Sequence, residues 1–89
     1  MKVFAVVYED RTIDGLECEI VSIHKARESA IKSMAEKKME ILDDWNITDI
    51  DNMKDGYEFH ENQEDYFLIL DIYDVSRTKV HIDEQELLE

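Results

Sequence analysis

The residues of this chain best suited to chemistry are one cysteine and three histidines: Cys18, His24, His60 and His81. Zinc sites pair such ligands at close spacing, as in Cys-x-x-Cys or His-x-x-x-His. None of the four has a partner at that spacing, and Cys18 and His60 fall on separate predicted strands. We therefore expect no metal site, with Cys18 and His60 as the first pair to test if a metal is found.

Cys18 is also poorly placed for nucleophilic catalysis, because it lies between Glu17 and Glu19. A reactive cysteine needs a stabilised thiolate, and neighbouring carboxylates oppose its ionisation. The chain has only two glycines, and neither belongs to a phosphate-binding loop motif. Carboxylates are so abundant that a pair of them says nothing about acid–base catalysis. The sequence predicts neither an enzyme nor a bound cofactor.

Residues 49–56, Asp-Ile-Asp-Asn-Met-Lys-Asp-Gly, superficially resemble a calcium-binding loop. A loop that starts at Asp51 places Gly56 at the sixth position, where the motif needs a glycine. The third position is then Met53, and the twelfth is Asn62 instead of a bidentate glutamate. The match fails, and no calcium site is expected.

Negative charge is the strongest signal in the sequence, and it is unevenly spread. The chain has a net charge of −13. Residues 39–75 hold twelve acids against one lysine, a balance of −11, whereas residues 25–38 hold five bases against two acids, a balance of +3. Such a field repels nucleic acid and anionic membranes and favours encounter with basic surfaces. We expect nine acids to bind a partner: Asp43, Asp44, Asp49, Asp51, Asp55, Glu58, Glu61, Glu64 and Asp65.

Two strands joined by a tight turn open the predicted fold. Residues 2–9 are β-branched and aromatic with apolar side chains on both faces, which is typical of a central strand. Asp14-Gly15 tolerates the positive φ of a hairpin turn, and residues 16–23 form the second strand. The apolar alternation changes phase at Ile20-Val21, which predicts a β-bulge there.

A long helix is predicted over residues 25–45, where apolar residues recur every three or four positions. The five bases of its first half do not lie on one face of the helix. We therefore expect them to pair with the protein's own acids, and we expect no direct binding of nucleic acid.

A second hairpin follows a polar connection. Strands are predicted over residues 57–61 and 66–76, with a turn at 62–65. Residues 66–73 are the most apolar run in the chain, and we expect them inside the sheet beside the first strand. Residues 80–82 predict a short edge strand.

The C-terminal residues are acidic. Residues 83–86 resemble the start of a helix, with Asp83 as the cap and Glu86 as its partner. They are expected to lie in a short acidic tail over about residues 83–89.

The fold expected for residues 1–89 is one α+β domain: a four-stranded antiparallel sheet with one long helix packed on one face, in the order β-β-α-β-β. The core is expected to include Phe4, Val6, Ile31, Leu42, Trp45, Phe67 and Ile69. The single cysteine fits a reducing compartment. The N-terminus lacks a secretory pattern, and no run is long enough to span a membrane. We expect a soluble cytoplasmic protein.

The hairpin and helix of about residues 3–35, with Glu-Ile-Val-Ser-Ile-His-Lys-Ala-Arg-Glu-Ser-Ala-Ile at 19–31, resemble small proteins of phages and prophages. The size and charge of the chain are similar to those of anti-CRISPR proteins, several of which act as acidic DNA mimics on Cas nucleases. This resemblance implies a phage-encoded protein that acts in the host-cell cytoplasm and binds a basic, nucleic-acid-accommodating surface of a Cas effector. It implies no catalytic residues.

Two functions therefore follow from the sequence. The first is a small acidic inhibitor that occupies a basic surface of a nucleic-acid-binding enzyme. The alternative is a structural or regulatory interaction module without nucleic-acid mimicry, dimeric through an exposed strand edge. Salt separates them, because charged contacts weaken as salt rises and apolar contacts do not.

Overall fold

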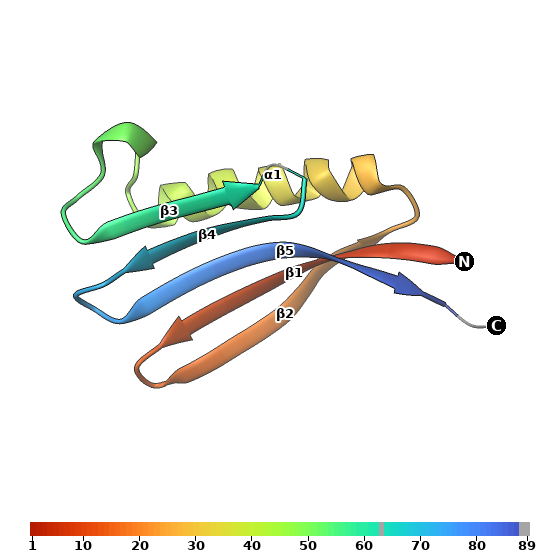
Figure 1. Ribbon diagram of the computed structural model, residues 1–89, viewed down its shortest axis with the longest axis horizontal. Coiled ribbons are helices and arrows are strands. Elements are labelled where there is room, and N and C mark those ends of the chain that lie inside the picture. The colour runs from red at the N-terminus through yellow and green to blue at the C-terminus, as the bar shows by residue number, and fades with distance from the viewer. Residues whose placement is uncertain (63, 88–89) are drawn as a thin grey trace.

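The computed structural model describes residues 1–62 and 64–87. In this part of the chain, five antiparallel strands form one sheet and an α-helix lies against it (Figure 1). The strands stand in the order β2-β1-β5-β4-β3, so β2 and β3 are the edges. In chain order the elements are β1 (Lys2–Thr12), β2 (Gly15–His24), α1 (Arg27–Asp44), the 3-10 helix η1 (Ile50–Asn52), β3 (Tyr57–Asn62), β4 (Tyr66–Asp71) and β5 (Ser76–Glu86). The α+β class and the β-β-α-β-β beginning are confirmed.

The first hairpin has the predicted turn and the predicted bulge. Thr12 pairs with Gly15, whose φ of 144° is a conformation that L side chains rarely adopt. Val6 pairs with Ser22 and Val7 with Ile20, so the residue between them in β2 is unpaired. This bulge shifts by one residue which side chains of β2 point to each face, and this shift accounts for the change of phase in the sequence.

The number of strands is corrected from four to five. Residues 66–76 do not form one strand: β4 ends at Asp71, whose carboxylate accepts hydrogen bonds from the backbone N–H of Tyr73 (3.0 Å) and of Asp74 (3.3 Å). This side-chain turn ends the strand. A long strand, Ser76–Glu86, then runs back through the middle of the sheet.

The last strand also corrects three finer predictions. β5 is central, not a short edge strand over residues 80–82, and it separates β4 from β1. Residues 83–86 form the end of this strand instead of a helix start or a free tail. The remaining residues of the expected tail include 88 and 89, which lie outside the described residues. The sequence pattern of this strand is weak because every second residue of β5 is polar. The face on which those polar residues lie is not covered by the helix.

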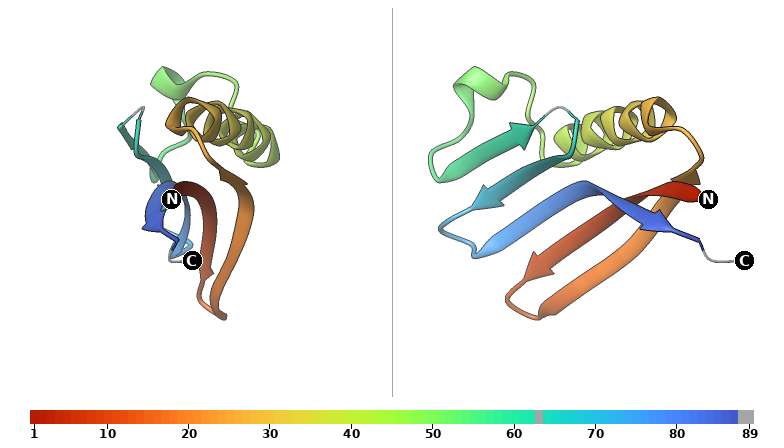
Figure 2. Two further views of the ribbon diagram at one scale, coloured as in Figure 1. Left: turned by 90° about the vertical axis from the view of Figure 1, so that its right-hand side faces the viewer. Right: turned by 45° about the vertical axis from the view of Figure 1, so that its right-hand side comes forward.

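Strand pairing assigns each residue to one of two faces, because directly opposite residues point the same way. The helix face, against which α1 packs, includes the row Tyr8, Val80 and Phe67. The other face, called the open face here, includes the next row, Val7, His81 and Tyr66. Figure 2 shows α1 on one side of the sheet. Among the described residues no helix packs on the open face.

The core lies between α1 and the helix face. Ala30, Met34 and Ile41 form the buried stripe of the helix. The strands contribute four further buried residues: Val6, Phe67, Ile69 and Val80. Burying a large apolar side chain contributes about 1.5–3 kcal/mol, so these few contacts hold the two layers together.

The predicted core is confirmed for Val6, Phe67 and Ile69, which are at most 1% exposed. The other four predicted core residues are only partly buried: Phe4, Ile31, Leu42 and Trp45. A single helix covers the middle of a five-stranded sheet, so side chains at its margins keep contact with water. No helix within the described residues has the length and apolar character needed to cross a membrane.

Candidate acidic binding surface

The nine predicted acids do not form one surface. Glu58 pairs with Leu70 and therefore lies on the open face, whereas Glu61 pairs with Phe67 on the helix face. Glu64 and Asp65 stand in the β3–β4 turn at the far end of the same hairpin. The four acids of residues 58–65 thus point in different directions, and two of them are bound to bases of α1.

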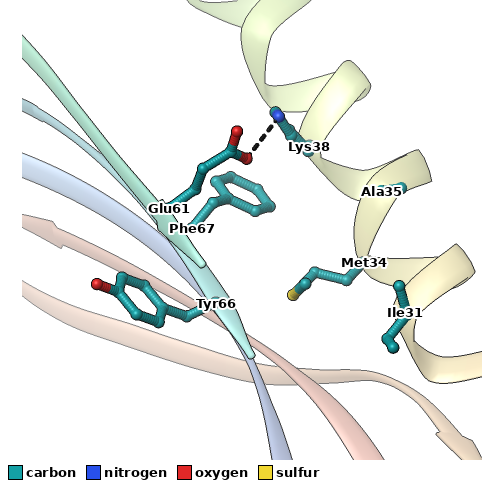
Figure 3. Close-up of a pocket in the computed structure, with 7 residues that line it drawn as sticks. All are labelled: Ile31, Met34, Ala35, Lys38, Glu61, Tyr66 and Phe67. Carbon is teal, nitrogen blue, oxygen red and sulfur yellow. Dashed lines mark hydrogen bonds and ion pairs between the residues drawn. The ribbon is translucent and has the colours of Figure 1, made fainter. Parts of the chain in front are cut away.

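Glu61 is bound to Lys38 across a groove between α1 and the β3–β4 hairpin (Figure 3). The carboxylate oxygen lies 2.7 Å from the Lys38 ammonium, which also stands 5.1 Å from the centre of the Phe59 ring. The groove has a volume of about 270 Å³, and Met34 of α1 and Phe67 of β4 are among the residues that line it. The Glu61 carboxylate is therefore already paired with a base of the same chain.

Asp65 is held in the same way by the start of the helix. Arg27 donates from Nη2 to the Asp65 carboxylate, and the same nitrogen donates to the backbone carbonyl of Glu64 at 3.0 Å. Lys37 makes a further ion pair with Glu40, at 3.8 Å. The prediction that bases of the helix pair with the protein's own acids is confirmed for these three.

The other five predicted acids gather where α1 ends and the following loop begins. Asp43 and Asp44 close the helix, and Asp49 accepts a hydrogen bond from the backbone N–H of Asp51 at 3.0 Å, which caps η1. Asp55 accepts a hydrogen bond from the Tyr73 hydroxyl at 3.2 Å. All five side chains are exposed to solvent: Asp43, Asp44, Asp49, Asp51 and Asp55.

The structure adds acids from the first hairpin to this group. Tyr8 pairs with Glu19, and Asp10 pairs with Glu17, so these side chains share the helix face. Burial of Tyr8, followed by the negative charges of Asp10, Glu19, Asp44 and Glu17, raises the pKa of its phenol above the ordinary 10.0. Strand pairing and this effect on the pKa of Tyr8 group four carboxylates from β1, β2 and α1. We call these four residues the Tyr8 cluster: Asp10, Glu17, Glu19 and Asp44.

Lys37 approaches this group. Its ammonium stands 4.8 Å from the centre of the Tyr8 ring. It offsets part of the negative charge of the four carboxylates. The sequence offered only part of this cluster, namely the alternation of Glu17 and Glu19. The approach of Asp44 depends on how α1 lies across the sheet, which local spacing does not encode.

The β4–β5 turn brings two more acids next to the helix end. Asp44, Asp71 and Asp74 line a shallow hollow of about 290 Å³ together with Trp45 and Tyr57. The first hairpin, the helix end, the loop and this turn all lie at the end of the molecule away from the chain termini (Figure 1). We call their acids the acidic end: Asp10, Glu17, Glu19, Asp43, Asp44, Asp49, Asp51, Asp55, Asp71 and Asp74.

Cys18 and His60 are too far apart to bind one metal ion. They lie on the opposite edge strands β2 and β3, in one row across the sheet that also contains Glu9, Lys79 and Leu68. Four interstrand steps of about 4.8 Å separate them by about 19 Å. Within residues 1–62 and 64–87, no group of three or more His, Cys, Asp or Glu residues has metal-binding geometry.

Comparison of the chain with protein-family models, with curated proteins and with solved structures gives no match.

Proposed function

We propose that this protein binds through its acidic end to a basic surface of a partner that otherwise accommodates nucleic acid. The observation that carries this proposal is the Tyr8 cluster: strand pairing places Asp10, Glu17 and Glu19 on one face beside Tyr8, and Asp44 at the end of α1 adds its charge. Carboxylates brought together from distant parts of a chain repel one another and cost stability. A partner surface rich in lysine and arginine offsets this repulsion on binding.

The charge density of the cluster supports competition with a nucleic-acid backbone. Alternate residues of a strand lie about 6.7 Å apart, so Glu17 and Glu19 alone give half the density of a DNA strand, which carries one phosphate per about 3.4 Å. Asp10, opposite Glu17 on the adjacent strand, and Asp44 at the end of the helix bring the number of charges to four. The rigid sheet holds them in place, which lowers the entropy lost on binding.

The contribution of each acid is small, so the proposal depends on their number. An exposed ion pair contributes about 0–1 kcal/mol, whereas complementary fields raise association rates by one to several orders of magnitude. The partner is therefore expected to bind fast and to release the protein as salt rises. Among such partners, a Cas effector is the one that the resemblance in size and charge implies, and we extend the proposal to that class.

The experiment compares two variants that each lose three negative charges. The first, Glu17→Gln, Glu19→Gln and Asp44→Asn, removes most of the Tyr8 cluster. The second, Glu28→Gln, Glu36→Gln and Glu86→Gln, removes the same charge from exposed positions outside the acidic end. Each tagged protein captures partners from a host lysate at low salt, and mass spectrometry identifies what duplex DNA or salt then elutes.

The wild type and the second variant are expected to retain nucleic-acid-binding proteins that added DNA displaces. The first variant is expected to lose them, chiefly through slower association. Equal capture by both variants across a salt titration contradicts the proposal, as does a partner that neither salt nor DNA displaces.

A second function is favoured by the β4–β5 turn. Ile72, Tyr73 and Val75 are more than half exposed there, which is unusual for three apolar residues in one turn. An interaction module without nucleic-acid mimicry could use them as apolar anchors. Capture that survives high salt and is lost in a Tyr73→Ser, Val75→Ser variant would favour this second function.

A further inference from the structure

The open face differs from the rest of the molecule in its charge. By strand pairing it holds three acids and three bases, so its net charge is zero. The acids and bases of the open face are Glu9, Glu58, Asp83, Arg11, Arg77 and Lys79. The chain as a whole has 23 acids and 10 bases, so 20 acids and 7 bases, the entire net charge of −13, lie elsewhere.

Apolar side chains occupy the β2 side of this neutral face. Leu16, Ile20 and Ile23 project from β2 and are 57%, 62% and 62% exposed. They lie beside three residues of β1 that their neighbours largely bury: Val3, Ala5 and Val7. Exposed apolar side chains that adjoin a buried apolar row are typical of an interaction surface. We call these six residues the apolar corner.

The edge of β2 is a poor place for a second chain to pair. Glu17 and Glu19 alternate with the apolar residues and point to the helix face, toward the Tyr8 cluster. If two copies paired antiparallel through this edge about Cys18, Glu17 of each strand would lie directly opposite Glu19 of the other. Like charges opposed across strands are destabilising, and the bulge at Val21 further interrupts a straight edge. Charge thus opposes pairing of the β2 edge in this register.

The open face does not have this obstacle. Two copies that meet there bring together surfaces of zero net charge, with bases and acids available to each other across a twofold axis. One ion pair already lies within the face, between Arg77 and Glu9 at 3.8 Å. At the acidic end, in contrast, a second copy brings the excess negative charge of both chains closer.

From this charge separation we infer that two copies of the chain associate through their open faces, with the apolar corner of each at the contact. The inference is independent of the function proposed above, because the Tyr8 cluster lies on the helix face and stays accessible in such a dimer. A dimer then presents two acidic ends, which raises its avidity for a partner with repeated basic sites.

Salt distinguishes this contact from the binding of a basic partner. Each copy carries a net charge of −13, so two copies repel at long range. Added salt screens that repulsion, with a Debye length of about 8 Å at 0.15 M, and leaves the apolar contact in place. Self-association is therefore expected to strengthen as salt rises, whereas binding of a basic partner is expected to weaken.

Sedimentation of the purified full chain over a range of concentration and salt tests the inference. The variant Ile20→Lys, Ile23→Lys places two bases in the apolar corner, and both positions are exposed enough to accept them without unfolding. It also lowers the net negative charge of the chain, so a loss of association cannot come from a larger net charge. Ser29→Lys, Met39→Lys makes the same change of charge at two exposed positions of α1, on the other side of the sheet from the open face.

The wild type is expected to dimerise reversibly, more strongly at high salt, and the control pair to do the same. The Ile20→Lys, Ile23→Lys variant is expected to dimerise at least about tenfold more weakly, a difference of about 1.4 kcal/mol. Circular dichroism checks that each variant keeps its fold. A wild type that stays monomeric at every concentration and salt overturns the inference, and so does a dimer that both variants form equally.

Cys18 provides a second measurement, because it is exposed and pairs with Glu9 on the open face. Its reaction with a thiol reagent is expected to slow as the protein concentration rises and the face becomes covered. If instead Glu17→Gln, Glu19→Gln strengthens association while Cys18 stays equally reactive, the contact is the β2 edge and the inference is wrong.

Discussion

The two faces of the sheet are built from the same strands, yet they differ in what they bury and in what charge they carry. The helix face holds the core under α1 and, beyond it, the carboxylates around Tyr8. The open face has zero net charge and leaves Ile20 and Ile23 in water. Adjacent residues of β1 illustrate the separation, since Asp10 joins the Tyr8 cluster while Glu9 pairs with Arg77. Successive side chains of a strand point to opposite faces of the sheet, so one stretch of sequence can build two unlike surfaces.

The largest expected effect tests which face carries the stability. Phe67 is 1% exposed under α1, and its neighbour Leu68 lies on the open face, partly buried. Figure 3 shows the Phe67 side chain directed toward the helix and the side chain of the preceding residue, Tyr66, directed away from it. Phe67→Ala is expected to cost about 3–5 kcal/mol, and Leu68→Ala clearly less. Urea unfolding measures both free energies, and equal losses would mean that the two faces are equally packed.

The second effect concerns the boundary between core and acidic cluster. Thr78 is 2% exposed, and its hydroxyl donates to an Asp10 carboxylate oxygen at 3.0 Å. Asp10→Ala leaves this buried hydroxyl without its partner, at a cost of about 1–3 kcal/mol. Thr78→Val removes the hydroxyl itself and is expected to cost less, because the carboxylate can turn to water. If the same unfolding assay finds Asp10→Ala neutral, the acid has only a surface role.

The same alternation explains how far the sequence could predict this fold. Strong local patterns sufficed for the first hairpin, its bulge and the helix, because their apolar residues repeat at the period of the element. Only residues 80–82 of β5 were predicted as a strand, because Arg77, Lys79 and His81 alternate with Thr78 and Val80, and a strand with one uncovered face does not need a continuous apolar run. Its central place depends on long-range pairing with β1 and β4, which no local pattern contains.

The acidic surface was predicted in part, for a related reason. Counting charge along the chain identified the loop acids Asp49, Asp51 and Asp55, which are near one another in sequence. It also included Glu61 and Asp65, which the fold binds to Lys38 and Arg27. It left out Asp10, which reaches the cluster only through strand pairing. Counting charge along the sequence gives the number of acids in a segment, whereas the register of strand pairing determines which acids lie close together.

The smallest expected effect is on the titration of Tyr8. Burial and the Tyr8 cluster raise the pKa of its phenol above 10.0, so the folded state holds this proton more tightly than the unfolded state does. The stability that this difference contributes is fully present below pH 10 and is lost as the pH rises through the folded pKa. The loss is expected to appear as a lower melting temperature in alkaline solution, and Tyr8→Phe removes it.

Neutralising the cluster then separates charge from burial. In the variant Glu17→Gln, Glu19→Gln, Asp44→Asn the phenol stays buried but loses most of its negative neighbours, so the pKa of Tyr8 is expected to fall part of the way back. The ultraviolet absorbance of tyrosinate, measured against the Tyr8→Phe protein in the same background, follows this one residue among four tyrosines. The matched variant Glu28→Gln, Glu36→Gln, Glu86→Gln loses the same charge elsewhere and is expected to leave the titration nearly unchanged. An equal fall in both variants would show that Tyr8 senses the net charge of the whole chain, and the four carboxylates would then not be a local cluster.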